Sequence, residues 1–245
     1  MTLFRTVNWA RYIVPAVLLV FWEIGVRLGV VDPLFFPAPS VIFQHFFVML
    51  AKGSLFSDFI ATATRVCIGV SVGGGIGLFV GLAMGWNKKF NSSTGGIISM
   101  AHPLPKISLL PLFFVLFGYG DTTMLILVGL TAFFPMVIAS RMAFTTMDAA
   151  LLDVCRNYDV KGFLFLRRMI LPACKPLILT GLQLAINTAL IVALSIEMLG
   201  SNNGLGSILW SGWQTMRLED IYVALFVIAL VGILVNSLIF KSEGQ

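Results

Sequence analysis

Residues that could carry catalytic or metal chemistry are few and scattered along the chain. The cysteines Cys67, Cys155 and Cys174 form no CxxC pair, and His45 and His102 have no partner at metal-ligand spacing. Metal sites and disulfide frameworks are recognised by such clusters, so we interpret the thiols as buried or incidental. The chain has no GxxxxGKS/T motif, which excludes ATP hydrolysis through a P-loop of its own. With no Ser/His/Asp or paired-carboxylate arrangement suited to catalysis, the sequence predicts that the protein is not an enzyme and has no metal site.

Polar residues gather instead in one interval, Asp153–Pro172, which reads DVCRNYDVKGFLFLRRMILP. It is basic overall and lies between two apolar runs that are each long enough to cross a bilayer. Within it, Val160, Phe163 and Leu164 recur at helical spacing, which favours a structured loop over a solvated connector. We therefore expect this loop to bind a partner protein.

The elements around this loop are those of an integral membrane protein. Of 245 residues, 58% are hydrophobic and only 11% are charged, whereas a soluble domain has roughly a quarter charged residues. The net charge of +5 does not indicate nucleic acid, because the bases fall in the gaps between apolar runs. Positive-inside topology explains them better.

Six apolar runs are candidate transmembrane helices, because a span needs about 20 apolar residues. They are Tyr12–Val31, Phe59–Gly85, a broken run Thr94–Phe117, Thr122–Phe144, Leu177–Leu199 and Ile221–Phe240. Most lysines and arginines fall on the same side as Arg5 and Arg11, which predicts cytoplasmic N- and C-termini. The Asp153–Pro172 loop is then cytoplasmic as well.

Short features fill the predicted outer side. Glu23 and Arg27, at i and i+4 near the outer end of the first helix, can neutralise each other. An FFPAPS turn ends that helix, and the ten apolar residues that follow predict an interfacial helix rather than a span. Phe117–Asp121 reads as a tight turn, and Trp210 and Trp213 are expected in the last outer loop.

One face of the second span is built from glycine at intervals of four residues. These positions are Gly69, Gly73, Gly77, Gly81 and Gly85. Because residues four apart share a helix face, another backbone can approach closely in lipid. The sequence leaves open whether that backbone belongs to the same chain or to a second subunit.

The third run is interrupted by His102-Pro103-Leu104-Pro105-Lys106. Proline removes ladder hydrogen bonds and kinks a helix, and a broken helix at membrane depth is tolerated where it is buried in protein or lines a wet cavity. Lys106, beside Pro105, is therefore either a cation of the transport pathway or a lysine that snorkels to an interface.

The fifth span carries a polar stripe. Gln183 and Asn187 lie four apart and share a face, and polar residues in such spans face a pathway or bridge helices. Taken together, the two residues are candidates for lining the transport pathway. Taken one by one, each fits an interhelix hydrogen bond better. Glu197 ends the span, where local capping and contact with an outer partner are equally compatible with the sequence.

The order of these features resembles the permease subunit of bacterial ABC importers, the binding-protein-dependent transport inner-membrane component, in its nitrate/sulfonate/taurine-type branch. The similarity covers nearly the whole chain after about residue 15. The pieces that carry it, in chain order, are FFPAPSVIF, TRVCIGVSVGGGIGLFVGLAMG, PLPKISLLPLFFVLFGYGD, FFPMVIAS, LLDVCRNYDVKGFLFLRRMILPACKPLILTGLQLAIN and EMLGSNNGLGSILW.

In that family the loop carries a coupling signature: Glu-Ala-Ala, three residues, Gly, and a later Leu-Pro. The resemblance thus makes residues of this loop the ATPase-docking element. They are Asp153, Val154, Cys155, Arg156, Asp159, Gly162, Arg167 and Pro172. Two departures stand out, because Asp153-Val154-Cys155 replaces Glu-Ala-Ala and Asp159 takes the glycine position. Glycine permits a positive φ and close approach to a partner; aspartate tolerates that conformation but adds charge and bulk.

The resemblance implies an all-α membrane protein of about six transmembrane helices with the type I ABC importer permease fold. It implies one permease domain, 1–245, with a core at 59–240 and a coupling loop at 146–176. The implied partners are an ABC ATPase that holds ATP and Mg, a periplasmic or lipid-anchored binding protein, membrane lipid and a second copy of the permease. The chain itself is expected to hold no cofactor and to bind no nucleic acid. Its expected location is the bacterial inner membrane.

The solute implied by the resemblance is a small anion such as an alkanesulfonate, taurine or nitrate. Thiamine-precursor pyrimidines and aromatic acids are alternatives, because the same branch imports them. A non-ABC secondary transporter fits less well, because the sequence shows no internal repeat.

Overall fold

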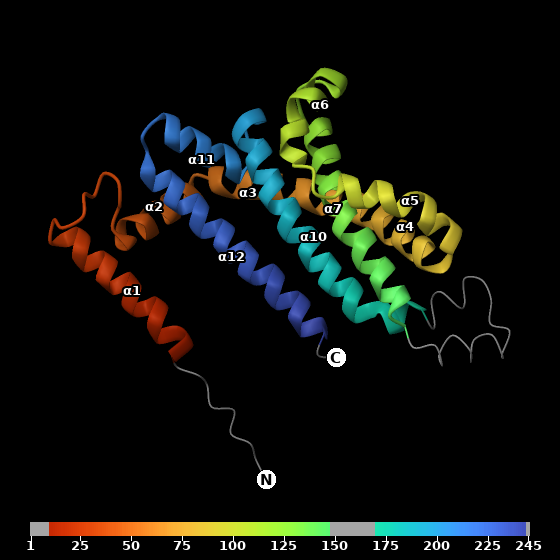
Figure 1. Cartoon of the computed structure of the whole chain (residues 1–245). Helices are drawn as coiled ribbons and strands as arrows, with labels where there is room; N and C mark the ends of the chain where they lie inside the picture. The colour runs from red at the N-terminus through yellow and green to blue at the C-terminus, as the bar shows by residue number, and fades with distance from the viewer. Residues whose placement is uncertain (1–9, 148–169, 244–245) are drawn as a thin grey trace, which may run out of the picture.

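The computed structural model describes residues 10–147 and 170–243, and regular structure within these ranges is helical (Figure 1). The helices before the gap are α1 (Ala10–Arg27), α2 (Pro39–Ala51), α3 (Ser54–Gly69), the π-helix η1 (Val70–Gly74), α4 (Gly75–Trp86), α5 (Lys88–Ala101), the 3₁₀-helix η2 (Lys106–Leu109), α6 (Leu110–Phe117) and α7 (Asp121–Thr145). After the gap come α10 (Leu171–Gly200), α11 (Leu205–Gln214) and α12 (Leu218–Glu243).

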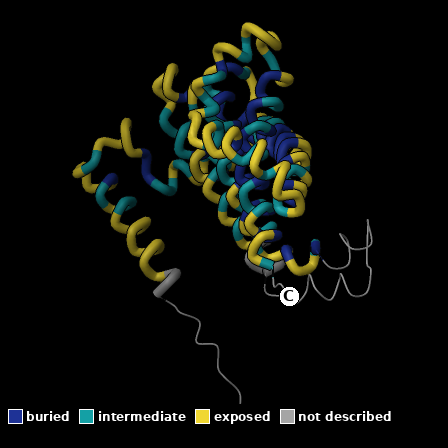
Figure 2. Tube along the Cα trace, turned by 45° about the vertical axis from the view of Figure 1, so that its right-hand side comes forward, coloured by how far each residue is buried: buried dark blue, intermediate teal, exposed yellow. Residues whose placement is uncertain are grey.

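Helix α7 is the centre of the bundle. Its residues Leu127, Val128, Ala132 and Val137 are fully buried, and Figure 2 shows that buried residues gather in the middle of the bundle. Helix α7 packs against α3, η1, α4 and α10, and α10 also touches α3 and η1 directly. Because α7 contacts most of the long helices, it holds them in one bundle.

Four helical stretches are long and apolar enough to cross a membrane among the described residues: Ser54–Trp86, Asp121–Thr145, Leu171–Gly200 and Leu218–Ser237. A bent pair, Lys88–Ala101 with Lys106–Phe117, makes a fifth if it counts as one span. The predicted first span is not among them: α1 has 18 residues and contains Arg11, Glu23 and Arg27. In the described part of the chain the structure thus supports four or five apolar spans.

The break predicted in the third run is confirmed. Helix α5 ends at Ala101, η2 begins at Lys106, and the two halves are bent by 86°. Pro103 and Pro105 occupy the interruption, where neither ring supplies a backbone N–H to a helix. Beyond α6, the Phe117–Asp121 turn is tight as expected, with Gly118 and Gly120 at φ of 81° and 147°.

The glycine face of α3, η1 and α4 contacts α7 of the same chain. A Cβ on Gly73 would lie 2.0 Å from the carbonyl oxygen of Gly129, and one on Gly77 would lie 2.4 Å from that of Phe133. The other three glycines, Gly69, Gly81 and Gly85, meet Val128, Ser140 and Phe144 of the same helix at 2.6, 2.0 and 2.5 Å. The two helices are therefore packed backbone against backbone along this face.

Helix α1 stands apart from the bundle and begins at the same end at which α12 finishes (Figure 1). The Glu23–Arg27 pair predicted from sequence is confirmed at 2.7 Å. Glu23 also accepts hydrogen bonds from the backbone N–H and hydroxyl of Ser40 at 3.0 and 2.8 Å, so it joins α1 to the first turn of α2. The short apolar helix predicted after the FFPAPS turn is α2, with 13 residues.

Two features, helix α11 and a contact between α2 and α12, were not predicted. The segment containing Trp210 and Trp213 was expected to be a loop, but it is helix α11. His45 Nε2 lies 2.6 Å from Asp220 Oδ1 and so joins α2 to α12. Both depend on contacts between distant parts of the chain.

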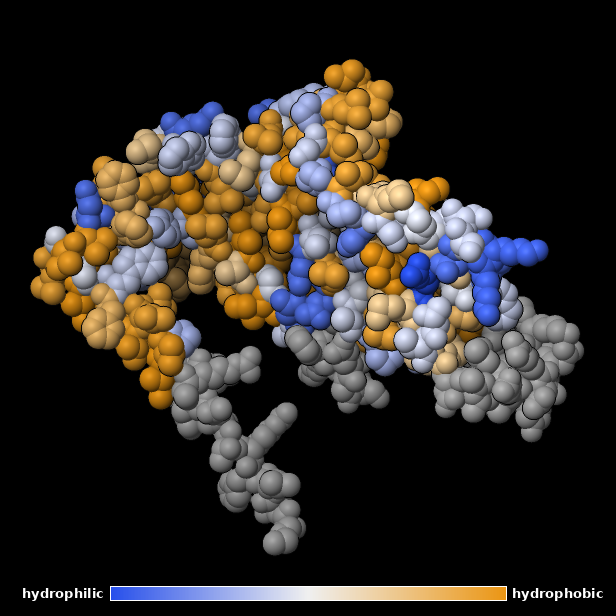
Figure 3. Space-filling model, viewed as in Figure 1, coloured by the Kyte–Doolittle hydropathy of each residue, from blue (hydrophilic) through white to orange (hydrophobic). Residues whose placement is uncertain are grey.

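The surface of the isolated chain is apolar. Figure 3 shows hydrophobic side chains over α1, the middle of the bundle and α6, and Phe21, Phe79 and Val115 are among the exposed ones, at 69%, 66% and 83%. Exposure on this scale is typical of a protein whose surroundings are lipid or a partner chain rather than water.

Candidate functional site

A buried ion pair lies at the distal end of the bundle, the end where α7 begins and α10 finishes. Arg65 of α3 is 6% exposed and Glu197 of α10 is fully buried. Arg65 Nη1 donates to Glu197 Oε1 at 2.8 Å, across 132 residues of sequence. A charge inside an apolar span is expensive unless it is paired, so this pair joins α3 to α10 strongly.

The remaining donors of Arg65 reach two further elements. Its Nε and Nη2 donate to Asp121 Oδ1, the first residue of α7, at 2.9 and 2.7 Å. Its Nη1 donates to the carbonyl of Asn203 at 3.0 Å, and its Nη2 to the Ser201 hydroxyl at 3.2 Å, both in the turn after α10. One guanidinium thus connects α3, α7, α10 and the following turn, a use suited to its rigid fork of five N–H donors.

The same cluster caps the beginning of α11. The first N–H groups of a helix have no partner within it, and here side chains from α3 and α10 accept from them. Asp58 Oδ1 accepts from Gly204 N at 2.8 Å, Thr62 Oγ1 from Leu205 N at 2.9 Å, and Glu197 Oε2 from Gly206 N at 3.0 Å. Thr62 also donates to Glu197 Oε2 at 2.8 Å, which completes the network.

The sequence alone does not indicate which of these residues contact each other. Arg65 and Glu197 stand out as charges inside apolar runs, a signal that polar residues in spans are functional or paired. For Glu197 the structure supports local capping, because Gly206 lies nine residues away. The ion pair to Arg65 was missed, since no spacing rule relates residues on different helices.

Lys106 lies at the break between α5 and α6. Its Nζ donates to the carbonyl of His102 and lies 4.7 Å from the centre of the Phe134 ring. Among the described residues, no carboxylate lies within ion-pair distance of this ammonium. His102 Nδ1 beside it is buried and finds no hydrogen-bond partner in the described ranges. Pro105, next to Lys106, is exposed.

The polar stripe of α10 points to α12. Gln183 Nε2 and Asn187 Nδ2 both donate to Asn236 Oδ1, at 2.9 and 3.4 Å. This is the interhelix hydrogen bonding that the sequence offered as one of two interpretations. Asn187 also belongs to the wall of a cavity, whereas Lys106 is not part of that wall, so the four candidate pathway residues do not converge on one point.

The predicted coupling loop falls almost wholly outside the described residues. Asp153, Val154, Cys155, Arg156, Asp159, Gly162 and Arg167 lie between 148 and 169. Pro172 is described and lies in the first turn of α10. Because α10 runs for 30 residues from Leu171 to Gly200, about 45 Å at 1.5 Å per residue, one helix connects the edge of this loop with Glu197.

Metal chemistry finds no support in the described part of the chain. No group of three His, Cys, Asp or Glu side chains there could hold a metal ion. Cys67 is an exposed free thiol and Cys174 a buried one.

Comparisons with known proteins agree with this architecture. The family model described as "Binding-protein-dependent transport system inner membrane component" matches residues 73–241. The SsuC protein of Bacillus subtilis (strain 168), whose name assigns it to aliphatic sulfonates transport, is 29% identical over 239 residues, covering 97% of this chain and 87% of that protein. The taurine transport system permease protein TauC of Escherichia coli (strain K12) is 24% identical over 226 residues, covering 90% and 82%.

The fold is also found in a solved structure of the MetNI methionine ABC transporter in an inward-facing conformation. The TM-score is 0.64 at 15% sequence identity, over 80% of this chain and 96% of that one. At this identity the likeness concerns the fold alone. Together with the family match over most of the chain, it confirms the type I permease fold expected from the sequence. The chain belongs to the family of binding-protein-dependent transport system inner membrane components, the permease subunits of ABC importers.

Proposed function

We propose that this chain is the membrane-spanning subunit of an ATP-driven importer for a small oxyanion, with an alkanesulfonate, taurine or nitrate as the solute. It works with a separate ATPase that holds ATP and Mg, with a binding protein at the outer face and with a second copy of itself. The complex lies in the bacterial inner membrane with cytoplasmic N- and C-termini. The similarity to SsuC and TauC over 97% and 90% of the chain supports this assignment.

The proposal that the solute is an anion rests on the environment of Lys106. Its ammonium sits at the broken span, held by a carbonyl and the face of Phe134, with no carboxylate among the described residues to neutralise it. Ionisable residues within membrane segments usually pair with each other or mark solute pathways. A sulfonate or nitrate supplies the missing negative charge and accepts charge-assisted hydrogen bonds.

Reconstitution tests the function directly. The chain is placed in proteoliposomes with an ABC ATPase and a binding protein from the same organism, and uptake of radiolabelled taurine, hexanesulfonate and nitrate is measured. We expect accumulation of one of these anions that needs ATP, the ATPase and the binding protein together. Uptake of a thiamine-precursor pyrimidine or an aromatic acid in their place would contradict the oxyanion assignment but keep the importer. Accumulation without the ATPase would contradict both.

Replacing Lys106 with glutamine should lower uptake of the anion by about ten- to a hundredfold. A hydrogen bond to a charged group contributes about 1.5–3 kcal/mol, and each 1.4 kcal/mol is tenfold in affinity. Initial uptake rates are compared with those of Lys52→Gln, which neutralises an exposed lysine at the end of α2. Equal uptake by the two variants, at equal recovery of the assembled complex, would remove Lys106 from the pathway.

A further inference from the structure

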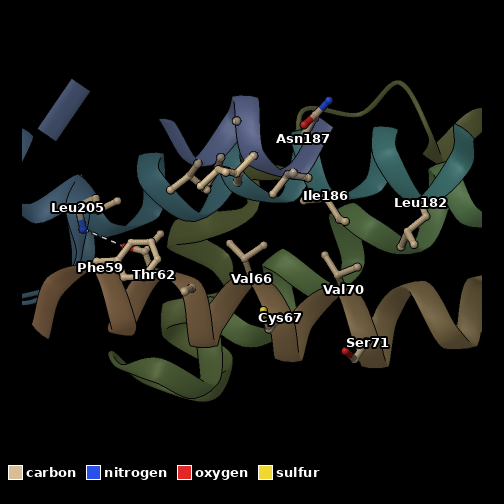
Figure 4. A pocket seen from close by; sticks show the side chains of 16 residues that line it. Phe59, Thr62, Val66, Cys67, Val70, Ser71, Leu182, Ile186, Asn187 and Leu205 are labelled. Carbon is tan, nitrogen blue, oxygen red and sulfur yellow. Dashed lines mark hydrogen bonds between the residues drawn. The ribbon is translucent and has the colours of Figure 1, made fainter. Parts of the chain in front are cut away.

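A cavity of about 490 Å³ lies within the chain, between α3 and η1 on one side, α10 on another and α12 on the third. Val66 and Val70 point across it toward Ile186 and Leu182 of α10 (Figure 4). Leu205 of α11 closes it near the distal end. The function proposed above rests on Lys106, which is not part of the cavity wall.

The wall of the cavity is apolar, and its polar groups are largely occupied. Among the described residues, no charged side chain lines it. The Thr62 hydroxyl donates to Glu197 and accepts from Leu205 N, and the Asn187 amide donates to Asn236. An anion buried here without a partner would be strongly unfavourable. The cavity therefore takes an apolar ligand and is not a site for an anionic solute.

The cavity lies at the depth of the candidate membrane spans. Its three walls belong to the candidate spans Ser54–Trp86, Leu171–Gly200 and Leu218–Ser237. Residues Leu182 and Ile186, near the middle of the second of these, line it. Helices of this length cross a hydrocarbon core of about 30 Å, so phospholipid acyl chains are present at the depth of the cavity.

The size of the cavity selects a thin occupant. A helix is at least 10 Å across and rises 1.5 Å per residue, so 490 Å³ corresponds to only about four residues of helix. A helix of a second copy can cover the opening but cannot enter. An unbranched acyl chain, one carbon wide, can. We propose that the cavity binds an acyl chain of a membrane phospholipid.

The bound chain would fill a gap in the packing of α12. Gly232 of α12 lines the cavity, and a Cβ added there would meet no atom within 4 Å. Leu234, two residues on, is 59% exposed in the isolated chain. Burying such surface against hydrocarbon and α3 gains dispersion contacts that an empty gap lacks. The lipid therefore stabilises the position of α12 against α3 and α10.

Two substitutions fill the cavity from opposite walls: Gly232→Phe from α12 and Ala63→Leu from α3. The control Gly96→Phe adds the same ring on α5, where a Cβ also meets open space, outside the cavity. The purified complexes are analysed by native mass spectrometry for retained phospholipid. Their melting temperatures are measured with and without added palmitoyl-oleoyl-phosphatidylglycerol.

We expect the wild-type complex and Gly96→Phe to retain one phospholipid per chain and to melt higher when the lipid is added. Gly232→Phe and Ala63→Leu should lose that lipid and the shift in melting temperature. No retained lipid in the wild type, or equal retention in the cavity variants, would overturn the proposal. So would a cavity variant that dissociates into single chains while it keeps its lipid, because a second copy would then be the occupant. None of these readouts involves transport, so they stand apart from the test of solute import.

Discussion

Replacing Gly73 with alanine is expected to destabilise the protein by about 3 kcal/mol, the upper end of the usual range for overpacking. The added Cβ would lie 2.0 Å from the carbonyl oxygen of Gly129 and 2.6 Å from its Cα. Both atoms belong to the backbone of α7, which cannot move aside as a flexible side chain can. The helices must separate, and α7 is the centre of the bundle. Thermal unfolding of the purified protein in detergent measures the loss.

Gly75→Ala is the matched control for this prediction. Gly75 lies two residues further along the same helical stretch, and a Cβ there would meet nothing within 4 Å. Alanine is favoured over glycine in a helix by roughly 0.5–1 kcal/mol, so this variant should melt at or above the wild type. The two substitutions are chemically identical and should differ in sign. Similar melting temperatures for Gly73→Ala and Gly75→Ala would show that the close contact with α7 is absent in the membrane protein.

Loss of the buried cation should be the most damaging change at the distal end. Arg65→Met leaves Glu197 fully buried without its charged partner, and breaking a buried pair from one side costs about 3–5 kcal/mol. The effect should extend to α11, because the same carboxylate accepts from Gly206 N. Unfolding in detergent gives the overall loss, and hydrogen exchange of the α11 amides shows whether its first turn opens.

Two further variants separate the ion pair from general damage. Arg27→Met removes a cation that is 69% exposed and pairs with Glu23; exposed pairs contribute about 0.2–1 kcal/mol. The double variant Arg65→Met with Glu197→Gln removes both buried charges and should recover most of the stability, because the new amide oxygen can still accept from Thr62 and Gly206. If Arg65→Met is as stable as Arg27→Met, the unpaired Glu197 charge has no large cost. The same conclusion follows if the double variant is no more stable than Arg65→Met alone.

The buried cluster around Arg65 and Glu197 also explains a helix that the sequence did not predict. Trp210 and Trp213 were placed in the connection between the last two spans, without a helix there. The segment that contains them forms a helix of ten residues, a length that is marginal in isolation. Its first N–H groups find acceptors on Asp58, Thr62 and Glu197, and two of these residues lie more than 140 positions before the groups they cap. The stability of α11 is therefore set by tertiary contacts.

Local features were predicted from the sequence alone, since their causes lie within a few residues. Apolar runs of span length indicated a helical membrane protein, and the order of its motifs indicated the permease family. Two prolines broke the third run, and the i, i+4 spacing of Glu23 and Arg27 gave their ion pair. The four-residue period of the glycines placed them on one helix face, because that period is a property of the helix itself.

Only the tertiary structure decided which surfaces meet. It assigned α7 as the partner of the glycine face, joined Arg65 to Glu197 across 132 residues, and directed Gln183 and Asn187 to Asn236. It also formed the apolar cavity between α3, α10 and α12. A sequence determines which side of a helix is small, charged or apolar through the geometry of the backbone. Which other helix covers that side depends on the packing of the whole bundle, and no local spacing encodes it.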